Sequence, residues 1–342
     1  MKPLLNTLFV TTPNAYLAKD GETVVVRVEQ EIRLRVPVHT LSGIVCFGPV
    51  TCSPFLLGLC AERGVQISFL TETGRFLAGV RGPVSGNVLL RRAQYRAADD
   101  ERRRLEMARH FVAGKIANAR TVLLRGARET EGPASKDLES AAGALASSLE
   151  EAGRVSSLDA LRGVEGEAAR RYFGVFSHLL RVNDPELRMD GRSRRPPLDP
   201  VNALLSFLYT LLVHDVRGAL ESVGLDPAVG YLHEDRPGRP GLALDLMEEF
   251  RPVLADRVAL TLINRRQIRP GDFRKLENGA VLLKEESRKT VLQAWQQRKQ
   301  EEVLHPLLGE RVAAGLLPHV QAMFAARCLR GELPAYPPFL WK

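Results

Sequence analysis

The sequence contains no run of about 18 apolar residues, so we expect no transmembrane helix and no membrane partner. Its four cysteines include no C-x-x-C pair, which excludes a disulfide-rich extracellular scaffold and gives little support to a zinc site. Residues 1–10 carry one positive charge and an interrupted apolar run, which predicts a first strand rather than a secretory signal. These absences together predict a folded, cytoplasmic protein with reduced thiols.

Lysine is also scarce, because only nine of the 48 basic residues are lysine and the rest are arginine. The formal net charge is +8, which favours polyanionic partners. A guanidinium group binds phosphate through two parallel donors, so an arginine excess suits nucleic acid. A GC-rich genome would raise the arginine content equally well. The charge therefore supports DNA binding without establishing it.

The first 86 residues have the pattern of β-structure. Residues 23–28 and 32–38 alternate apolar and polar side chains, as half-buried strands do. Hairpin turns are expected at residues 19–22, where Gly21 permits a positive φ, and at residues 73–74. One short helix is expected from an N-cap at Ser53. No catalytic constellation is visible in this part of the chain.

The pattern turns helical from residue 87 onward. Residues 91–128 combine apolar positions with a dense basic face, which fits a solvated helix surface and a phosphate-binding surface equally well. Residues 129–150 are rich in Glu, Ala, Ser and Gly, and they predict a mobile connection or a weak helix. Residues 184–200 predict a basic loop that is disordered without a partner.

An apolar helix is expected at residues 200–218, and helical structure is expected from Arg251 to the C-terminal tail. The predicted fold class is therefore α+β. A β-rich N-terminal domain (residues 1–86) precedes a larger all-α catalytic domain (residues 87–342).

One carboxylate stands out on the helix expected around residues 158–172. Its apolar residues form a single stripe, and Glu165 falls inside that stripe while Glu167 points away from it. A carboxylate facing a core is costly unless it is paired or binds a metal. An ion pair with an arginine of another helix explains Glu165 as well as a metal does. Gly163 and Gly166 would let another group approach the backbone beside it.

A second acidic set lies on the short helix expected after Pro240. Asp245 and Glu248 share one face of that helix among apolar side chains. An acid in a first turn also complements the helix dipole, which explains Asp245 without any function. His233 lies in the loop before this helix and has no support of its own as a ligand. As a set, these oxygen and nitrogen donors favour Mg²⁺ or Mn²⁺ over zinc.

Four segments resemble the CRISPR-associated integrase ("Cas-one") family in their order and placement. They are GVEGEAARRY (163–172), PVNALLSF (200–207), GYLH (230–233) and LALDLMEEFRP (242–252). The ending YPPFLWK (336–342) is similar to the subtype I-C branch. The resemblance implies a metal-dependent DNA endonuclease and integrase that inserts short foreign fragments into a CRISPR array. In that reaction the 3′-hydroxyl of the fragment attacks a phosphodiester directly.

The resemblance also implies roles for particular residues. The metal ligands correspond to Glu165, His233 and Glu248, and Asp245 matches a neighbouring catalytic acid that supports the ligands or positions substrate. Relatives often have Asp at the position of Glu248, so the geometry around the metal is less defined than its presence. Asn202 and Ser206 match a helix near the site, although Asn202 is explained equally well as a helix cap.

The implied partners are double-stranded DNA, a second copy of the chain in a homodimer, a small ferredoxin-like protein that completes a heterohexamer, and an adaptation exonuclease. Arginines of residues 91–128, 184–195 and 264–266 are the candidates for phosphate contacts.

Two alternative functions remain open. One is a metal-dependent nuclease that acts on branched DNA with water as nucleophile. The other is a non-catalytic DNA-binding scaffold, in which Glu165 and Glu248 only pair with arginines.

Overall fold

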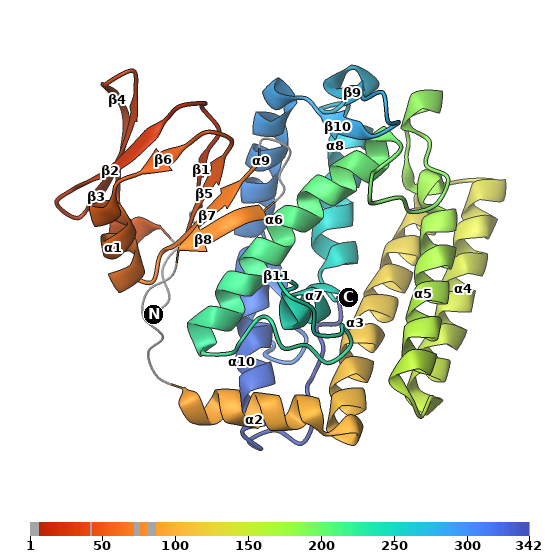
Figure 1. The fold of residues 1–342 in the computed structure, drawn as a ribbon. Helices are drawn as coiled ribbons and strands as arrows, with labels where there is room; N and C mark the ends of the chain where they lie inside the picture. The colour runs from red at the N-terminus through yellow and green to blue at the C-terminus, as the bar shows by residue number, and fades with distance from the viewer. Residues whose placement is uncertain (1–6, 42, 72–75, 81–86, 342) are drawn as a thin grey trace. The chain divides into compact units, whose positions relative to one another are not determined.

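The computed structural model describes residues 7–41, 43–71, 76–80 and 87–341 (Figure 1). The chain forms two compact units. The first comprises Met1–Gly86 together with Glu285–Gln300, and the second comprises Asn87–Lys284 together with Glu301–Lys342. A β-rich N-terminal region is thus followed by a larger helical region, which confirms the predicted α+β class.

The first unit contains two four-stranded sheets. The strands of one sheet, in spatial order, are β1 (Thr7–Val10), β5 (Gly43–Phe47), β7 (Gln66–Leu70) and β8 (Phe76–Val80). Those of the other are β4 (Glu31–Pro37), β3 (Thr23–Val28), β2 (Tyr16–Asp20) and β6 (Thr51–Cys52). Residues of both sheets and of helix α1 (Pro54–Glu62) share one apolar core. The helix α9 (Glu285–Gln300) joins this unit, and Gln296 Nε2 donates to the carbonyl of Thr7 at 2.9 Å.

Local signals in this unit largely predicted its elements. Gly21 has a φ of +58° in the β2–β3 hairpin, and the hydroxyl of Ser53 accepts the N–H of Leu56 at 3.2 Å as the N-cap of α1. The expected turn at residues 73–74 lies outside the described residues. The strand expected at residues 32–38 forms as β4, but the expectation that it is half-buried was wrong. The strand β4 lies at the edge of its sheet and exposes the apolar side chains of Ile32 and Leu34.

The second unit is built on long helices. They are α2 (Val88–Asp99), α3 (Glu101–Arg128), α4 (Pro133–Arg154), α5 (Leu158–Gly174) and α6 (Pro200–Val223), followed by the shorter α7 (Gly241–Met247), a π-helical turn (Arg251–Asp256), α8 (Arg257–Asn264) and α10 (Leu317–Leu329). Helices α3, α4 and α5 pack side by side (Figure 1). Short 3₁₀ segments span Val38–Thr40, Phe176–Leu179, Pro185–Leu187, Pro270–Asp272 and Ala314–Leu316.

Two helical expectations need correction. The basic segment at residues 91–128 is not one helix, because the carboxylate of Asp100 accepts the N–H of Arg103 at 3.0 Å and begins a new helix there. Of the two alternatives for residues 129–150, the helix forms and the mobile connection was wrong. The segment lies mostly in α4, whose Leu138 and Leu145 are buried at helical spacing, and packing outweighs its weak intrinsic propensity.

The helix α6 confirms the apolar helix expected at residues 200–218. It is long and apolar enough to cross a membrane by length and composition alone, yet 56% of its apolar window is buried inside the protein. That burial is typical of a core helix.

The expectation of continuous helix after Arg251 was wrong. Two antiparallel hairpins interrupt the helices, one formed by β9 (Phe273–Lys275) and β10 (Val281–Leu283), the other by β11 (Glu302–Leu304) and β12 (Arg311–Ala313). In the first hairpin Gly279 has a φ of +81° and follows Asn278, which is a turn signal that helical periodicity hides. Residues 330–341, the C-terminal tail, have no regular structure.

Candidate metal centre

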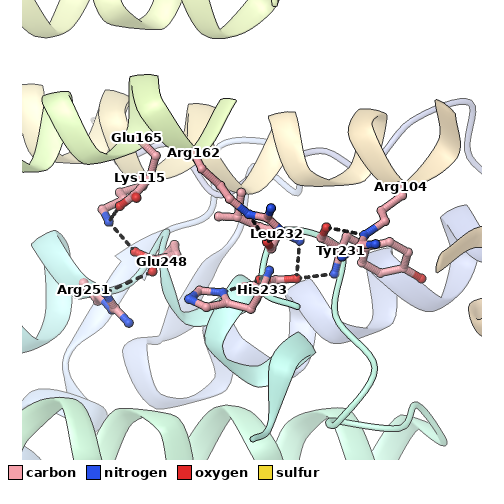
Figure 2. A network of polar contacts seen from close by, with 10 residues as sticks. Arg104, Lys115, Arg162, Glu165, Tyr231, Leu232, His233, Glu248 and Arg251 are labelled. Carbon is pink, nitrogen blue, oxygen red and sulfur yellow. Dashed lines mark hydrogen bonds and ion pairs between the residues drawn. The ribbon is translucent and has the colours of Figure 1, made fainter. Parts of the chain in front are cut away.

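Three helices bring two carboxylates to one ammonium group. Lys115 of α3 hydrogen-bonds Glu165 of α5, and its Nζ lies 2.8 Å from Oε2 of Glu248, which directly follows α7. The guanidinium of Arg251 lies 3.0 Å from the other oxygen of Glu248. Figure 2 shows Lys115 placed between the two glutamates, with Arg251 beside Glu248. We call Lys115, Glu165, Glu248 and Arg251 the ion-pair cluster.

The cluster is withdrawn from solvent. The side chains of Glu248 and Lys115 are 3% and 11% exposed, whereas that of Glu165 is 24% exposed. Burial opposes ionisation of Glu248, but Arg251, Lys115 and His233 hold its pKa at about 2. Burial likewise opposes the charge of Lys115, but Glu248 and Glu165 keep its pKa above the ordinary value. Lys115 and Glu248 are therefore both charged at neutral pH.

The loop at residues 230–233, here the histidine loop, is held through its backbone amides. The carboxylate of Asp245 accepts the N–H groups of Tyr231, Leu232 and His233, at 2.5, 3.0 and 3.0 Å. The same carboxylate lies 2.6 Å from Nδ1 of the His233 ring. Asp245 is completely buried. Its hydrogen bonds to the histidine loop therefore explain the position of Asp245. The helix dipole does not explain it, because Asp245 lies outside the first turn of α7.

Two arginines hold the same loop through its carbonyls (Figure 2). Arg162 donates from Nε at 3.0 Å and from Nη2 at 2.9 Å to the carbonyl of Leu232. Arg104 donates from Nε to the carbonyl of Tyr231 at 3.0 Å. Because Arg162 precedes Glu165 by three residues on α5, it ties the helix that carries Glu165 to the loop that carries His233.

Two glycines let the loop reach Asp245. A Cβ on Gly230 would lie 2.7 Å from the backbone of Gly241 and 2.9 Å from the Asp245 carboxylate. A Cβ on Gly241 would lie 2.7 Å from the carbonyl oxygen of Ala228. Neither position tolerates a side chain without a backbone shift, so the close approach requires glycine at both.

The arrangement fits a divalent cation by the chemistry of its donors. With Nδ1 of His233 held by Asp245, the imidazole extends from its loop toward Glu248 in Figure 2. A carboxylate that fixes the second ring nitrogen is the usual support of a metal-binding histidine. Within the described residues, no three His, Cys, Asp or Glu side chains form a closed metal-binding group. Instead, the ammonium of Lys115 supplies positive charge to both Glu165 and Glu248.

The structure thus gathers the four predicted site residues in one region and adds four that sequence reasoning missed. The missed residues are Lys115, Arg251, Arg104 and Arg162. A signal for Lys115 was available, because it lies one helical turn after the buried Phe111 and one turn before the buried Ala119, inside the apolar stripe of α3. The ion pair considered for Glu165 exists, but its partner is this lysine and not an arginine.

The loop at residues 184–200 is ordered around a buried asparagine. Asp199 caps α6 by accepting the N–H of Asn202 at 2.8 Å, so the interpretation of Asn202 as a cap was wrong. Asn202 Oδ1 accepts from Arg192 at 2.6 Å, and the hydroxyl of Ser206 accepts from the same guanidinium at 3.0 Å. Arg192 and Arg251 both lie over the ring of Tyr209, at 5.3 and 5.0 Å from its centroid.

The basic residues of α3 do not form one solvated face. Arg109 donates to the carbonyl of Val155, and the guanidinium of Arg125 lies 3.8 Å from the centre of the Trp341 ring. Exposed basic residues of the second unit include Arg102, Arg103, Arg128, Arg265 and Arg266. These are the candidates that remain available to DNA phosphates.

Behind Glu248, the adjacent Glu249 binds the C-terminal tail. Its carboxylate accepts from the hydroxyl of Tyr336, the N–H of Phe339 and the amide of Gln321. Burial raises the pKa of Glu249 to about 8, although these three donors oppose the rise. Asn118 of α3 donates to the carbonyls of Glu249 and Phe339, at 2.8 Å in each case. The tail therefore connects α3 to the segment that carries Glu248.

Residues 8–297 match the model of the family described as CRISPR associated protein Cas1. The chain belongs to this family. It is 55% identical, over the whole length of both chains, to a protein of Chlorobaculum tepidum named CRISPR-associated endonuclease Cas1 1. A Cas1 protein from Thermotoga maritima shares the fold with a TM-score of 0.83 at 24% identity, covering 95% of this chain and 97% of that one. A casposase bound to integration product gives a TM-score of 0.83 at 23% identity, with coverage of 100% and 95%.

Proposed function

We propose that this Cas1 protein is a divalent-metal-dependent DNA endonuclease and integrase whose metal ligands are Glu165, His233 and Glu248. The observation that carries the proposal is the convergence of two carboxylates, one on α5 and one directly after α7, on the largely buried ammonium of Lys115, beside an imidazole fixed by Asp245. Carboxylate oxygens and one imidazole suit Mg²⁺ or Mn²⁺.

The bound ion would polarise a phosphodiester and stabilise the leaving oxygen. The residues of the chain prepare the site for that chemistry. Asp245 and Arg162 fix the position of His233, while Arg251 balances the charge of Glu248. A Cβ at Gly163 or Gly166 would meet no described atom within 4 Å, so the helix surface next to Glu165 is open to a substrate. The open surface agrees with the expectation that another group can approach the backbone at Gly163 and Gly166.

The proposed reaction is strand transfer, in which the 3′-hydroxyl of a short fragment attacks a phosphodiester of a CRISPR array. The name of the Chlorobaculum relative supports cleavage, and the casposase with its integration product supports joining. Arginines such as Arg102, Arg265 and Arg266 would contact phosphate, so affinity for DNA should fall steeply with salt.

The proposed assembly contains a homodimer and a small ferredoxin-like partner in a heterohexamer, of the kind expected for subtype I-C, together with an adaptation exonuclease. A chain of this fold has been solved in a complex with Cas2, and a Geobacter relative is named a fusion of the exonuclease Cas4 with Cas1. The exposed Ile32 and Leu34 of β4 offer the first unit an apolar surface for dimerisation.

Strand joining tests the proposal directly. The full-length protein and its small partner are incubated with a labelled duplex and a supercoiled plasmid bearing a repeat, in Mn²⁺ or Mg²⁺. We expect label to be joined to plasmid, and we expect a chelator or Glu165→Gln to abolish joining. Glu167→Gln is the matched control, because Glu167 lies on the same helix and pairs there with Arg170 and Arg171. Joining by Glu165→Gln at the wild-type rate would rule out the assigned site.

The same assay separates the two alternatives. A fragment with a 3′-deoxy end blocks joining but leaves hydrolysis by water intact, so cleavage without joining would favour a branched-DNA nuclease. The ion pairs of Glu165 and Glu248 also fit a purely structural role. A scaffold of that kind would bind DNA but would neither cut nor join it in any metal.

A further inference from the structure

The four members of the ion-pair cluster balance in charge. Lys115 and Arg251 contribute two positive charges, and Glu165 and Glu248 contribute two negative charges. This charge balance matters because the cluster is largely buried. A net charge in a buried site is poorly screened by water and salt. A divalent cation that enters the cluster therefore changes its formal charge from zero to +2.

The two cations of the cluster differ in how they are held. Arg251 pairs with Glu248 and also stacks over Tyr209, so its planar group is fixed on two sides. Lys115 reaches both glutamates through a single Nζ at the end of a flexible four-carbon stem. Its ammonium can leave the carboxylates by rotation about that stem, without a movement of α3.

We propose that Lys115 is a resident counter-cation, which neutralises Glu165 and Glu248 in the metal-free protein and is displaced from them when the divalent metal binds. The displaced ammonium remains protonated in the site and pairs with a non-bridging oxygen of the DNA phosphate. Metal and DNA then bind cooperatively, because the metal frees a cation that the phosphate needs. This inference rests on the proposed function, since it requires the metal to bind at Glu165 and Glu248.

The proposal predicts effects of opposite sign for one substitution. Without Lys115 the metal-free cluster has a net charge of −1, so the metal should bind more tightly. The phosphate loses a cation, so strand transfer should slow. A lysine with a merely structural role gives a different result, because its loss would loosen the glutamates and weaken both properties.

The test measures the affinity for Mn²⁺ by electron paramagnetic resonance. It compares the full-length wild type with Lys115→Met and with the matched control Lys136→Met, which lies on the exposed face of α4. We expect Lys115→Met to bind Mn²⁺ about tenfold more tightly or better, the size of effect that one neighbouring charge commonly produces. At saturating Mn²⁺, its strand joining should be at least about tenfold slower. Equal or weaker Mn²⁺ binding by Lys115→Met overturns the proposal.

Two further variants make the outcome unambiguous. Lys115→Gln keeps a donor for Glu248 and removes only the charge, so it carries the test if Lys115→Met does not fold. Glu165→Gln separates this inference from the proposed function. If Glu165→Gln leaves Mn²⁺ binding unchanged, the assigned metal site is wrong. If Glu165→Gln weakens binding but neither Lys115 variant tightens it, only the role of Lys115 is wrong.

Discussion

The two halves of the site are held together by different forces. The ion-pair cluster joins side chains of opposite charge from separate helices. The histidine loop is held by hydrogen bonds to its backbone, with Asp245 on the amides and Arg162 and Arg104 on the carbonyls. The cluster therefore sets the net charge around Glu165 and Glu248, whereas the loop sets the position of the imidazole. Substitutions in the two halves should fail in different ways.

The largest effect is expected for Asp245→Ala. Three backbone N–H groups and the His233 ring lose their acceptor in a buried place. Since each unsatisfied buried donor costs about 1–3 kcal/mol, we expect the free energy of unfolding to fall by about 3 kcal/mol or more, together with loss of strand joining. Urea denaturation measures the first quantity. The exposed Asp235 provides the control Asp235→Ala, and an Asp245→Ala protein as stable as that control would refute the account of the histidine loop.

Arg162→Ala should affect activity more than stability. It removes two donors from the carbonyl of Leu232 and leaves the side chain of His233 unchanged. Groups that orient metal ligands commonly change activity by about 10- to 100-fold, and we expect a loss of that size in the rate of joining. Arg170→Ala is the control, because Arg170 lies on the same helix with an exposed side chain. Arg162→Lys should recover part of the loss, because it restores one donor. Equal rates for the two alanine variants would show that Arg162 does not position His233.

An effect that depends on pH separates Glu248 from its neighbour Glu249. Charge partners hold the pKa of Glu248 at about 2, whereas burial raises that of Glu249 to about 8. The folded protein therefore retains a proton on Glu249 that the unfolded chain has lost above its ordinary pKa of 4.5. The stability that Glu249 contributes is complete below that value and is lost as pH rises through about 8.

The variant Glu249→Gln isolates this contribution. Its free energy of unfolding relative to wild type should rise with pH between these two pKa values, by up to about 1.4 kcal/mol per pH unit, and then level off. Denaturation of both proteins from pH 5 to pH 9 measures the difference, which also cancels the contribution of Asp256 and its raised pKa of about 6. A difference that does not vary with pH would contradict the assignment.

The ion-pair cluster was easier to predict from the sequence than the histidine loop. Glu165 was predictable because a carboxylate inside an apolar stripe needs a partner, and the same reasoning applies to Lys115 on α3. His233 carried no local signal. Its position depends on Asp245, twelve residues away, and on Arg162, which lies on another helix. The resemblance to a family linked these residues where periodicity could not.

The elements of the fold also divide into those that local sequence signals predicted and those that they did not. Signals within a few residues predicted the β2–β3 hairpin and the Ser53 cap, because each depends on one turn of chain. Packing between distant segments decided the rest. Composition left open whether residues 129–150 are a mobile connection or a weak helix, and packing makes them most of α4. Asn202 binds Arg192 of the preceding loop and does not cap α6. Such contacts follow from tertiary structure, which local patterns do not contain.

In the proposed site, one divalent cation binds to Glu165, Glu248 and the imidazole of His233. Pulsed electron paramagnetic resonance of bound Mn²⁺ can show this binding, because it detects a directly coordinated nitrogen. We predict one Mn²⁺ per chain with a nitrogen coupling that disappears in His233→Gln, and weaker binding in Glu165→Gln. A Mn²⁺ centre without that coupling, or one that persists unchanged in both variants, would contradict the account.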